Sequence, residues 1–186
     1  MGALKFRVLL DTEQETEIFR DILIDERDNF ESLYHAIISA FRFQGDQMAS
    51  FYMSNEDWDK GHEISLMDLN YGDEAIDEKA SLMSAAVIAD FIEVTDQKII
   101  LVYDFLRMWI FLIELLEHSP EPIDKPQVLM SIGMAPPEDS RMADFDEDEE
   151  DITAIGEDEF GDDEEWKEDE LEDGYDEEDY RSYDDY

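Results

Sequence analysis

Residues 99–117, IILVYDFLRMWIFLIELLE, form the densest apolar stretch of the chain, so any hydrophobic core must be built on them. A membrane-spanning helix needs about twenty apolar residues with few or no charges. Asp104, Arg107 and Glu114 interrupt this stretch, and each would cost roughly 2.5–3.5 kcal/mol near the centre of an inserted helix. Strands with two largely apolar faces explain it better. We therefore expect a central hairpin over about 97–117 in the middle of a sheet.

Hydrophobic spacing elsewhere predicts the elements that pack around this hairpin. Apolar residues from Phe30 to Phe41 recur every three or four positions, which predicts an amphipathic helix over about 29–43. Alanines and larger apolar residues at helical spacing predict a second helix over about 79–92. Alternation predicts strands over 3–10, 16–24, 48–54 and 63–69, and a short helix is expected over 127–134. The expected fold class is α+β, a mostly antiparallel sheet packed by two helices.

The composition changes abruptly at residue 138. From there to residue 186 the chain holds 27 acidic residues and only 3 basic ones, and its few apolar residues are isolated. Such a segment cannot bury enough apolar surface to offset its conformational entropy, and its charges repel one another. The sequence therefore predicts an α+β domain over 1–137 and a disordered acidic tail over 138–186.

Charge and cysteine content restrict the possible partners and chemistry. The whole chain has a formal net charge of −41, and residues 1–137 alone carry 27 acidic against 10 basic residues. Direct nucleic-acid binding is disfavoured, because it depends on cationic side chains that neutralise phosphates. Basic proteins or peptides are the electrostatically favoured partners, and the tail is the segment most suited to contact them. The chain has no cysteine, which excludes disulfides, thiolate zinc sites and cysteine nucleophiles.

No secretory signal is recognised in the first residues, MGALKFRVLL, so we expect a cytoplasmic protein that does not enter the membrane. The sequence contains no glycine-rich phosphate loop and no dinucleotide fingerprint. We therefore assign no catalytic, cofactor-binding or metal-binding residue and expect no cofactor. The oligomeric state stays open at this level.

Two ionisable residues have alternative interpretations. Asp104 interrupts an apolar face, and we favour a structural carboxylate that caps the hairpin turn by accepting bonds from backbone N–H groups. The alternative makes it a site acid or metal ligand together with Glu114, whereas Arg107 could pair with Asp104 across the turn. His35 lies beside the apolar face of the first predicted helix, where a packed or partly exposed histidine is favoured over a site residue.

The order of several motifs resembles one known family. Tyr103-Asp104-Phe105, then Trp109 and Glu114, are similar to that family's strand ending in Tyr-Asp-Phe, the Trp that follows and a Glu-bearing strand. Further matches are His35 in the helix, then Asp46, Gln47, Met48, Ser50, Phe51, Trp58, Glu63, Ile64 and Leu66, and finally Gly133, Ala135, Pro136, Pro137, Glu138 and Asp139. Over about residues 4–139 the chain resembles a divergent, Bacteroidetes-type member of the plasmid pRiA4b Orf-three-like family.

This resemblance implies an α+β fold and no established activity, and some relatives are labelled as insertion-element passenger proteins. Many relatives carry Gly-Asp after Tyr-Asp-Phe and Arg-His after the Trp. Leu106-Arg107 and Ile110-Phe111 stand at those positions here, so this chain lacks any site that the polar residues form in relatives. The motif candidates are Tyr103, Asp104, Phe105, Trp109, Glu114 and His35.

The sequence favours an uncharacterised, non-enzymatic interaction or accessory protein. Its acidic tail would serve solubility, contact basic partners or mimic nucleic acid. One alternative is a metal-assisted enzyme that uses Asp104 and Glu114. Another is a mobile-element-associated protein that acts on nucleic acid or mimics it.

Overall fold

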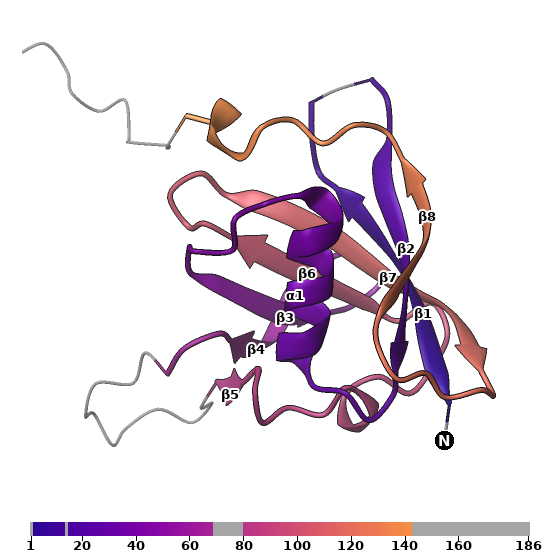
Figure 1. Cartoon of the computed structure of the whole chain (residues 1–186). Coiled ribbons are helices and arrows are strands. Elements are labelled where there is room, and N and C mark those ends of the chain that lie inside the picture. The colour runs from indigo at the N-terminus through magenta and orange to yellow at the C-terminus, as the bar shows by residue number, and fades with distance from the viewer. Residues whose placement is uncertain (1, 14, 69–79, 143–186) are drawn as a thin grey trace, which may run out of the picture. The chain divides into compact units, whose positions relative to one another are not determined.

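The computed structural model describes residues 2–13, 15–68 and 80–142. Eight strands form one sheet in the order β5-β4-β3-β6-β7-β1-β2-β8, and helix α1 packs on it (Figure 1). All neighbouring strands are antiparallel except β4 and β5. The elements are β1 (Ala3–Leu10), β2 (Ile18–Asp25), α1 (Phe30–Phe41), β3 (Ala49–Ser54), β4 (Lys60–Ser65), β5 (Ser81–Leu82), η1 (Ile88–Asp90), β6 (Lys98–Tyr103), β7 (Trp109–Ser119), β8 (Gln127–Ile132) and η2 (Glu138–Ser140). The α+β class is confirmed, with a single α-helix among the described residues.

The predicted central hairpin is confirmed as β6 and β7. The two strands pair from Lys98 opposite Glu114 to Tyr103 opposite Trp109. They occupy the middle of the sheet, where β3 and β1 supply a partner on each side. Adjacent residues of β6 face opposite sides of the sheet, yet Leu101 is fully buried and Val102 is 1 % exposed. The chain thus uses its most apolar segment where both faces of a strand must be covered.

Helix α1 forms where the apolar spacing predicts it. The Asn29 side chain caps its first turn by accepting a 2.9 Å hydrogen bond from the Ser32 backbone N–H. The helix ends at Arg42, which adopts the left-handed conformation with φ of 62°. Its buried face contacts the sheet through edge-to-face aromatic pairs, with ring centroids 5.2 Å apart for Phe30 and Phe51 and 5.0 Å apart for Phe41 and Phe111.

The second predicted helix, over 79–92, is wrong. Residues 80–92 instead form the short strand β5, a set of turns and the 3-10 helix η1, and residue 79 lies outside the described residues. Met83, Ala86, Ile88 and Ile92 of this segment are buried, whereas Ala85 and Ala89 are exposed, so the spacing identified part of the core but not the backbone conformation.

The physical reason is that several backbone groups of this segment form hydrogen bonds with other elements. The Ala86 carbonyl accepts from Phe30 N at 3.0 Å, and the Met83 carbonyl accepts from Glu31 N at 3.2 Å. Both donors belong to the first turn of α1, whose N–H groups have no partner within the helix. Met83 N donates in turn to the Ser65 carbonyl at 2.9 Å. These long-range bonds use groups that a helix over 79–92 would pair internally, and the local bonds that remain, such as Ala86 N to the Leu82 carbonyl at 2.9 Å, form only isolated turns.

The short helix expected over 127–134 is also wrong, because Gln127–Ile132 forms strand β8 on the outer edge of β2 (Figure 1). Gly133 ends this strand with a φ of +73°. A Cβ atom at Gly133 would lie 2.8 Å from the Glu17 carbonyl oxygen, closer than real Cβ contacts come. Glycine is therefore required both by the backbone conformation and by the close approach of the segment before β2.

The last described residues, 138–142, begin the segment that the sequence assigns to the tail. They include η2 and pack against the turn between β6 and β7. The rest of the predicted tail, 143–186, lies outside the described residues, and its disorder stays a prediction. Among the helices in the described ranges, none is long and apolar enough to cross a membrane.

We predict that Gly133→Ala lowers the free energy of unfolding by about 2 kcal/mol or more, since the left-handed conformation alone costs a non-glycine residue roughly 1–2 kcal/mol and the new methyl group overlaps the Glu17 carbonyl. Urea unfolding measures the change. The matched control is Met134→Ala, because the Met134 side chain is 88 % exposed. Equal stability of the two variants would contradict this role of Gly133.

Candidate functional site

The family-motif residues Tyr103 and Trp109 lie opposite each other where β6 ends and β7 begins. Both are almost completely buried, and Phe43, just beyond α1, packs between them, with ring centroids 5.9 Å from Tyr103 and 5.1 Å from Trp109. The segment Glu138–Arg141, which we call the C-terminal strap, crosses this end of the hairpin. Two motifs that are far apart in the sequence therefore meet here.

The carboxylate of Glu138 is the centre of this contact. Its Oε1 accepts a 2.6 Å hydrogen bond from the Tyr103 hydroxyl, and its Oε2 accepts a 2.6 Å bond from the Gln44 backbone N–H. The indole Nε1 of Trp109 donates to the Glu138 carbonyl at 3.1 Å. The Tyr103 hydroxyl also accepts from Gly45 N at 3.0 Å. Hydrogen bonds to an ionised acceptor are stronger than neutral ones, so Glu138 anchors the strap.

A second tyrosine lies beside Tyr103. The Tyr34 ring is 6.3 Å from the Tyr103 ring between centroids, and its hydroxyl is buried with no hydrogen-bond partner among the described residues. Burial, reinforced by the charges of Glu138 and Asp46, raises the pKa of Tyr34 to about 12. Burial and the hydrogen bond to Glu138 raise the pKa of Tyr103 well above its ordinary value. Both phenols are therefore protonated at neutral pH and can act as donors but not as general bases.

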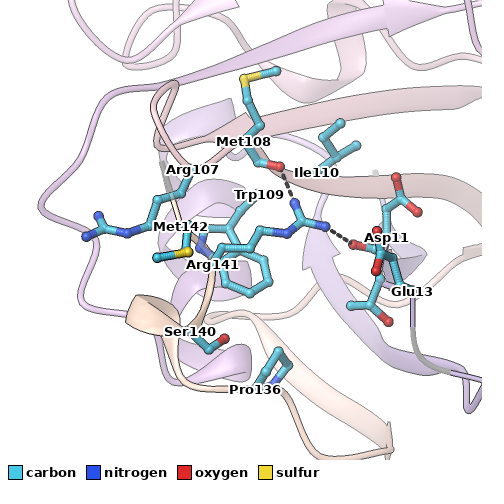
Figure 2. Close-up of a pocket in the computed structure, with 11 residues that line it drawn as sticks. Asp11, Glu13, Arg107, Met108, Trp109, Ile110, Pro136, Ser140, Arg141 and Met142 are labelled. Carbon is cyan, nitrogen blue, oxygen red and sulfur yellow. Dashed lines mark hydrogen bonds between the residues drawn. The ribbon is translucent and has the colours of Figure 1, made fainter. Parts of the chain in front are cut away.

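Arg141 closes the strap over the outer side of the hairpin turn. Its guanidinium lies 4.7 Å above the Trp109 ring and donates to the Met108 carbonyl and, at 3.0 Å, to the Asp11 carbonyl. Figure 2 shows Arg141 extending across Trp109 between these two loops. The surrounding hollow has a volume of about 590 Å³ and is lined by the strap, the hairpin turn and residues 11–13. The Arg141 guanidinium thus occupies part of the hollow and is already hydrogen-bonded to two backbone carbonyls.

Asp104 caps the hairpin turn, as the structural interpretation predicts. Its Oδ1 accepts from Leu106 N at 3.1 Å and from Arg107 N at 3.2 Å, and its Oδ2 accepts from the Arg107 guanidinium at 2.9 Å. The predicted pairing of Asp104 with Arg107 is therefore confirmed, and the hydrogen bond to Asp104 raises the pKa of Arg107. Asp104 is 2 % exposed and has a φ of 56°, a conformation that Asp tolerates better than most residues.

The structure does not bring the other motif candidates to this place. Glu114 lies five residues along β7 from Trp109, opposite Arg7 and Lys98, which corresponds to about 17 Å at roughly 3.4 Å per residue. His35 is exposed on α1, and Phe105 is 38 % exposed at the turn. Within residues 2–13, 15–68 and 80–142, no group of three or more His, Asp or Glu residues could hold a metal ion.

Sequence reasoning missed Glu138 and Arg141 as members of this cluster. Glu138 was recognised only as part of a motif, because acidic residues dominate the chain that follows it. The available signal was the contrast around Arg141, one of 3 basic residues after position 137. The contacts of Glu138 with Tyr103 and of Arg141 with Trp109 depend on the path that the chain takes after β8. No local sequence pattern predicts that path.

We predict opposite outcomes for two Tyr→Phe substitutions. Tyr34→Phe removes a buried hydroxyl that has no described partner, so stability at pH 7 should be unchanged or higher. Tyr103→Phe leaves the Oε1 atom of Glu138 and the Gly45 N–H without this partner, which should cost about 1–3 kcal/mol. Thermal and urea unfolding measure both, and a larger loss for Tyr34→Phe would contradict the hydrogen-bond assignment.

The raised pKa of Tyr34 can be tested through the pH dependence of stability. Because the pKa of Tyr34 is about 12 in the folded protein, the folded state keeps this proton after the unfolded state has lost its own. The free energy of unfolding should therefore fall as pH rises from the ordinary tyrosine pKa of about 10 toward 12. Tyr34→Phe should make this decline shallower.

The capping role of Asp104 is tested by Asp104→Ala and Asp104→Asn. The alanine variant leaves two turn N–H groups without an acceptor and should lose about 1–3 kcal/mol of stability. The asparagine variant keeps an acceptor oxygen and tolerates positive φ, so it should lose less. Unfolding free energies equal to that of the parent for both variants would count against the structural role.

Two of three comparisons with known proteins found a match. No curated protein matches the chain. A crystal structure described as a protein of unknown function, MM3350 from Methanosarcina mazei Go1, superposes with a TM-score of 0.63 and 19 % sequence identity, covering 76 % of each chain, which shows a shared fold. The family model described as plasmid pRiA4b ORF-3-like protein matches residues 2–182. This chain therefore belongs to the plasmid pRiA4b ORF-3-like family.

Proposed function

We propose that this protein is a non-enzymatic interaction or accessory protein. The observation that carries the proposal is the state of the polar motif residues at the end of the central hairpin. The Asp104 carboxylate is bonded to turn N–H groups and to Arg107, and Tyr103 is bonded to Glu138. Groups that are fully bonded within the chain stabilise its fold and have little capacity left to act on a substrate.

The partners that fit best are basic proteins or peptides. The chain has 54 acidic and 13 basic residues, and half of the acidic residues follow position 137. A concentrated negative charge raises the association rate of cationic partners and disfavours anionic ones. In this proposal the acidic segment attracts the partner as well as keeping the protein soluble.

Two alternatives receive less support. A metal-assisted enzyme based on Asp104 and Glu114 would need both carboxylates at one ion, but they lie at opposite ends of the β6–β7 hairpin. Direct action on nucleic acid is opposed by the net charge of −41. Mimicry of nucleic acid is compatible with that charge, and its partner would be a basic nucleic-acid-binding protein.

We predict that the full chain binds a fluorescent oligolysine peptide in fluorescence anisotropy and that raising NaCl from 50 to 500 mM weakens the binding steeply. A chain ending at Met142 should bind far more weakly, whereas a chain with residues 143–186 in scrambled order should bind like the parent. A neutral peptide of equal length is the negative control. Binding that is unchanged by salt and by truncation would overturn the electrostatic proposal. Co-purification from native cells would then identify the physiological partner.

A further inference from the structure

The face of the sheet opposite α1 carries a hollow of about 150 Å³ between β1, β7 and the loop that joins β3 to β4. Its β7 members, Leu112 and Glu114, lie on this face because they alternate along the strand with Phe111, which packs against α1. Trp58 of the loop also lines the hollow. Trp58 and Glu114 both belong to the family motifs, and the cluster at the end of the hairpin includes neither of them. The hollow therefore brings together two motif residues that have no role there.

Two carboxylates line the hollow, Glu17 and Glu114, and neither has a hydrogen bond or an ion pair within the described ranges. Glu114 lies opposite Arg7 in the sheet, but the Arg7 guanidinium turns to its other neighbour, Asp21, with bonds of 2.8 and 2.9 Å. Lys98, which lies opposite Glu114 on the other side, donates instead to a backbone carbonyl of the β3–β4 loop at 2.8 Å. Both carboxylates are therefore free to accept bonds from a group that enters the hollow.

Two aromatic rings, those of Trp58 and Phe19, also line the hollow. Each ring already has a cation of the chain beside it. The Lys98 Nζ atom lies 5.0 Å from the centroid of the Trp58 ring. The Arg7 Cζ atom lies 4.3 Å from the centroid of the Phe19 ring. Aromatic faces attract cations through their electrostatic quadrupole, and Trp does so most strongly, so aromatic walls beside free carboxylates are suited to a further cation.

The loop that carries Trp58 is fixed by hydrogen bonds within the chain. The Asn55 Oδ1 atom accepts from the backbone N–H groups of Asp57 and Asp59 at 3.0 and 2.9 Å. The Trp58 backbone N–H donates to the Asn55 carbonyl at 3.2 Å. Trp58 has a φ of 64°, a conformation that bulky residues rarely adopt. A side chain that is held in place before binding loses less conformational entropy when a partner docks.

Charge and size restrict what the hollow can hold. Three carboxylates and two cations line or border it, which leaves one net negative charge: Glu17, Glu114, Asp21, Arg7 and Lys98. The whole chain, with a net charge of −41, also attracts cations and repels anions. A volume of about 150 Å³ holds one group of roughly the size of benzene, so a single cationic head group fits.

A guanidinium group matches these walls better than an ammonium group. Its plane stacks on an aromatic ring while the N–H groups at its edge bond to carboxylates, whereas an ammonium group is a compact and strongly hydrated charge. Leu9 and Leu112, which lie opposite each other in the sheet, give the hollow an apolar floor. Such a floor favours the more weakly hydrated cation.

We propose that the hollow between Trp58, Glu17 and Glu114, which we call the Trp58 pocket, binds an arginine side chain of a basic partner. The guanidinium lies beside the Trp58 ring and donates hydrogen bonds to the two carboxylates. This inference rests on the proposed function, because it names how the folded part of the chain recognises a basic partner. The acidic segment attracts any cation, whereas the Trp58 pocket selects arginine.

The first experiment is a titration of the full chain with an acetylated and amidated Gly-Gly-Arg-Gly-Gly peptide, followed by ¹H–¹⁵N correlation NMR. It is done in about 150 mM NaCl, which screens contacts between exposed charges. The indole N–H resonance of Trp58 should shift and reach saturation. The indole N–H of Trp109, which donates to the Glu138 carbonyl, is the internal control and should stay in place.

Two matched peptides test the choice of arginine. Citrulline in place of arginine keeps the shape without the charge and should give no shift of the Trp58 indole resonance. Lysine keeps the charge without the planar group and should bind more weakly. No shift with the arginine peptide, or equal affinity for either matched peptide, would overturn the proposal.

The second experiment compares variants that each remove one negative charge. Glu114→Gln and Glu17→Gln change the Trp58 pocket, and Glu121→Gln changes an exposed residue outside it. Each pocket variant should raise the dissociation constant of the arginine peptide about fivefold or more, because one charge-assisted hydrogen bond is weakened. The Glu121 control should leave it nearly unchanged, since a single distant charge is screened. Glu17 is exposed and precedes β2, so its substitution leaves the core intact. Equal effects of the pocket and control variants would overturn the proposal.

The oligolysine titration separates failure of this inference from failure of the proposed function. If the pocket variants behave like the control while the full chain still binds oligolysine in a salt-dependent way, the Trp58 pocket is wrong and the proposed function stands. If the full chain binds neither oligolysine nor the arginine peptide, both proposals are wrong.

Discussion

The structure depends on burying the two central strands, β6 and β7, between neighbours in the middle of the sheet. Leu101 and Val102 are adjacent in β6 and face opposite sides, yet both are buried. A strand of this kind cannot lie at an edge, because one of its faces or its backbone would then meet water. The positions of β3 and β1 on either side follow from this requirement, as does the packing of α1 across the apolar face.

The end of this hairpin is held by charge-assisted hydrogen bonds. Asp104 closes the turn, and Glu138 fastens the C-terminal strap to Tyr103 and to the backbone after α1. Both carboxylates accept bonds from groups of the chain itself, so Tyr103, Asp104 and Glu138 have a structural role in this chain. The features that distinguish the described part of the chain are its excess of acidic residues and the bonded carboxylates at this end of the hairpin.

Elements defined by a local sequence pattern could be predicted, whereas elements defined by contacts between distant segments could not. The β6–β7 hairpin and α1 were predicted because their apolar spacing is regular over many residues. The helix over 79–92 and the short helix over 127–134 were wrong because the backbone bonds of those segments go to distant partners, the first turn of α1 and the edge of β2. At the site, the pairing of Asp104 with Arg107 was predicted because the two residues are only three positions apart. The contacts of Glu138 and Arg141 with Trp109 join segments about 30 residues apart.

The sequence by itself determined the family, the α+β class, the central hairpin, the role of Asp104 and the strongly anionic character of the chain. These properties depend on composition or on residues that are close together in the sequence, so they can be predicted from the sequence alone. Only the tertiary structure decided that β8 is an edge strand, that Glu138 meets Tyr103 and that Glu114 is remote from Asp104. Each of these depends on which segments far apart in the chain become neighbours, and that is fixed by the packing of the whole sheet rather than by any one pattern.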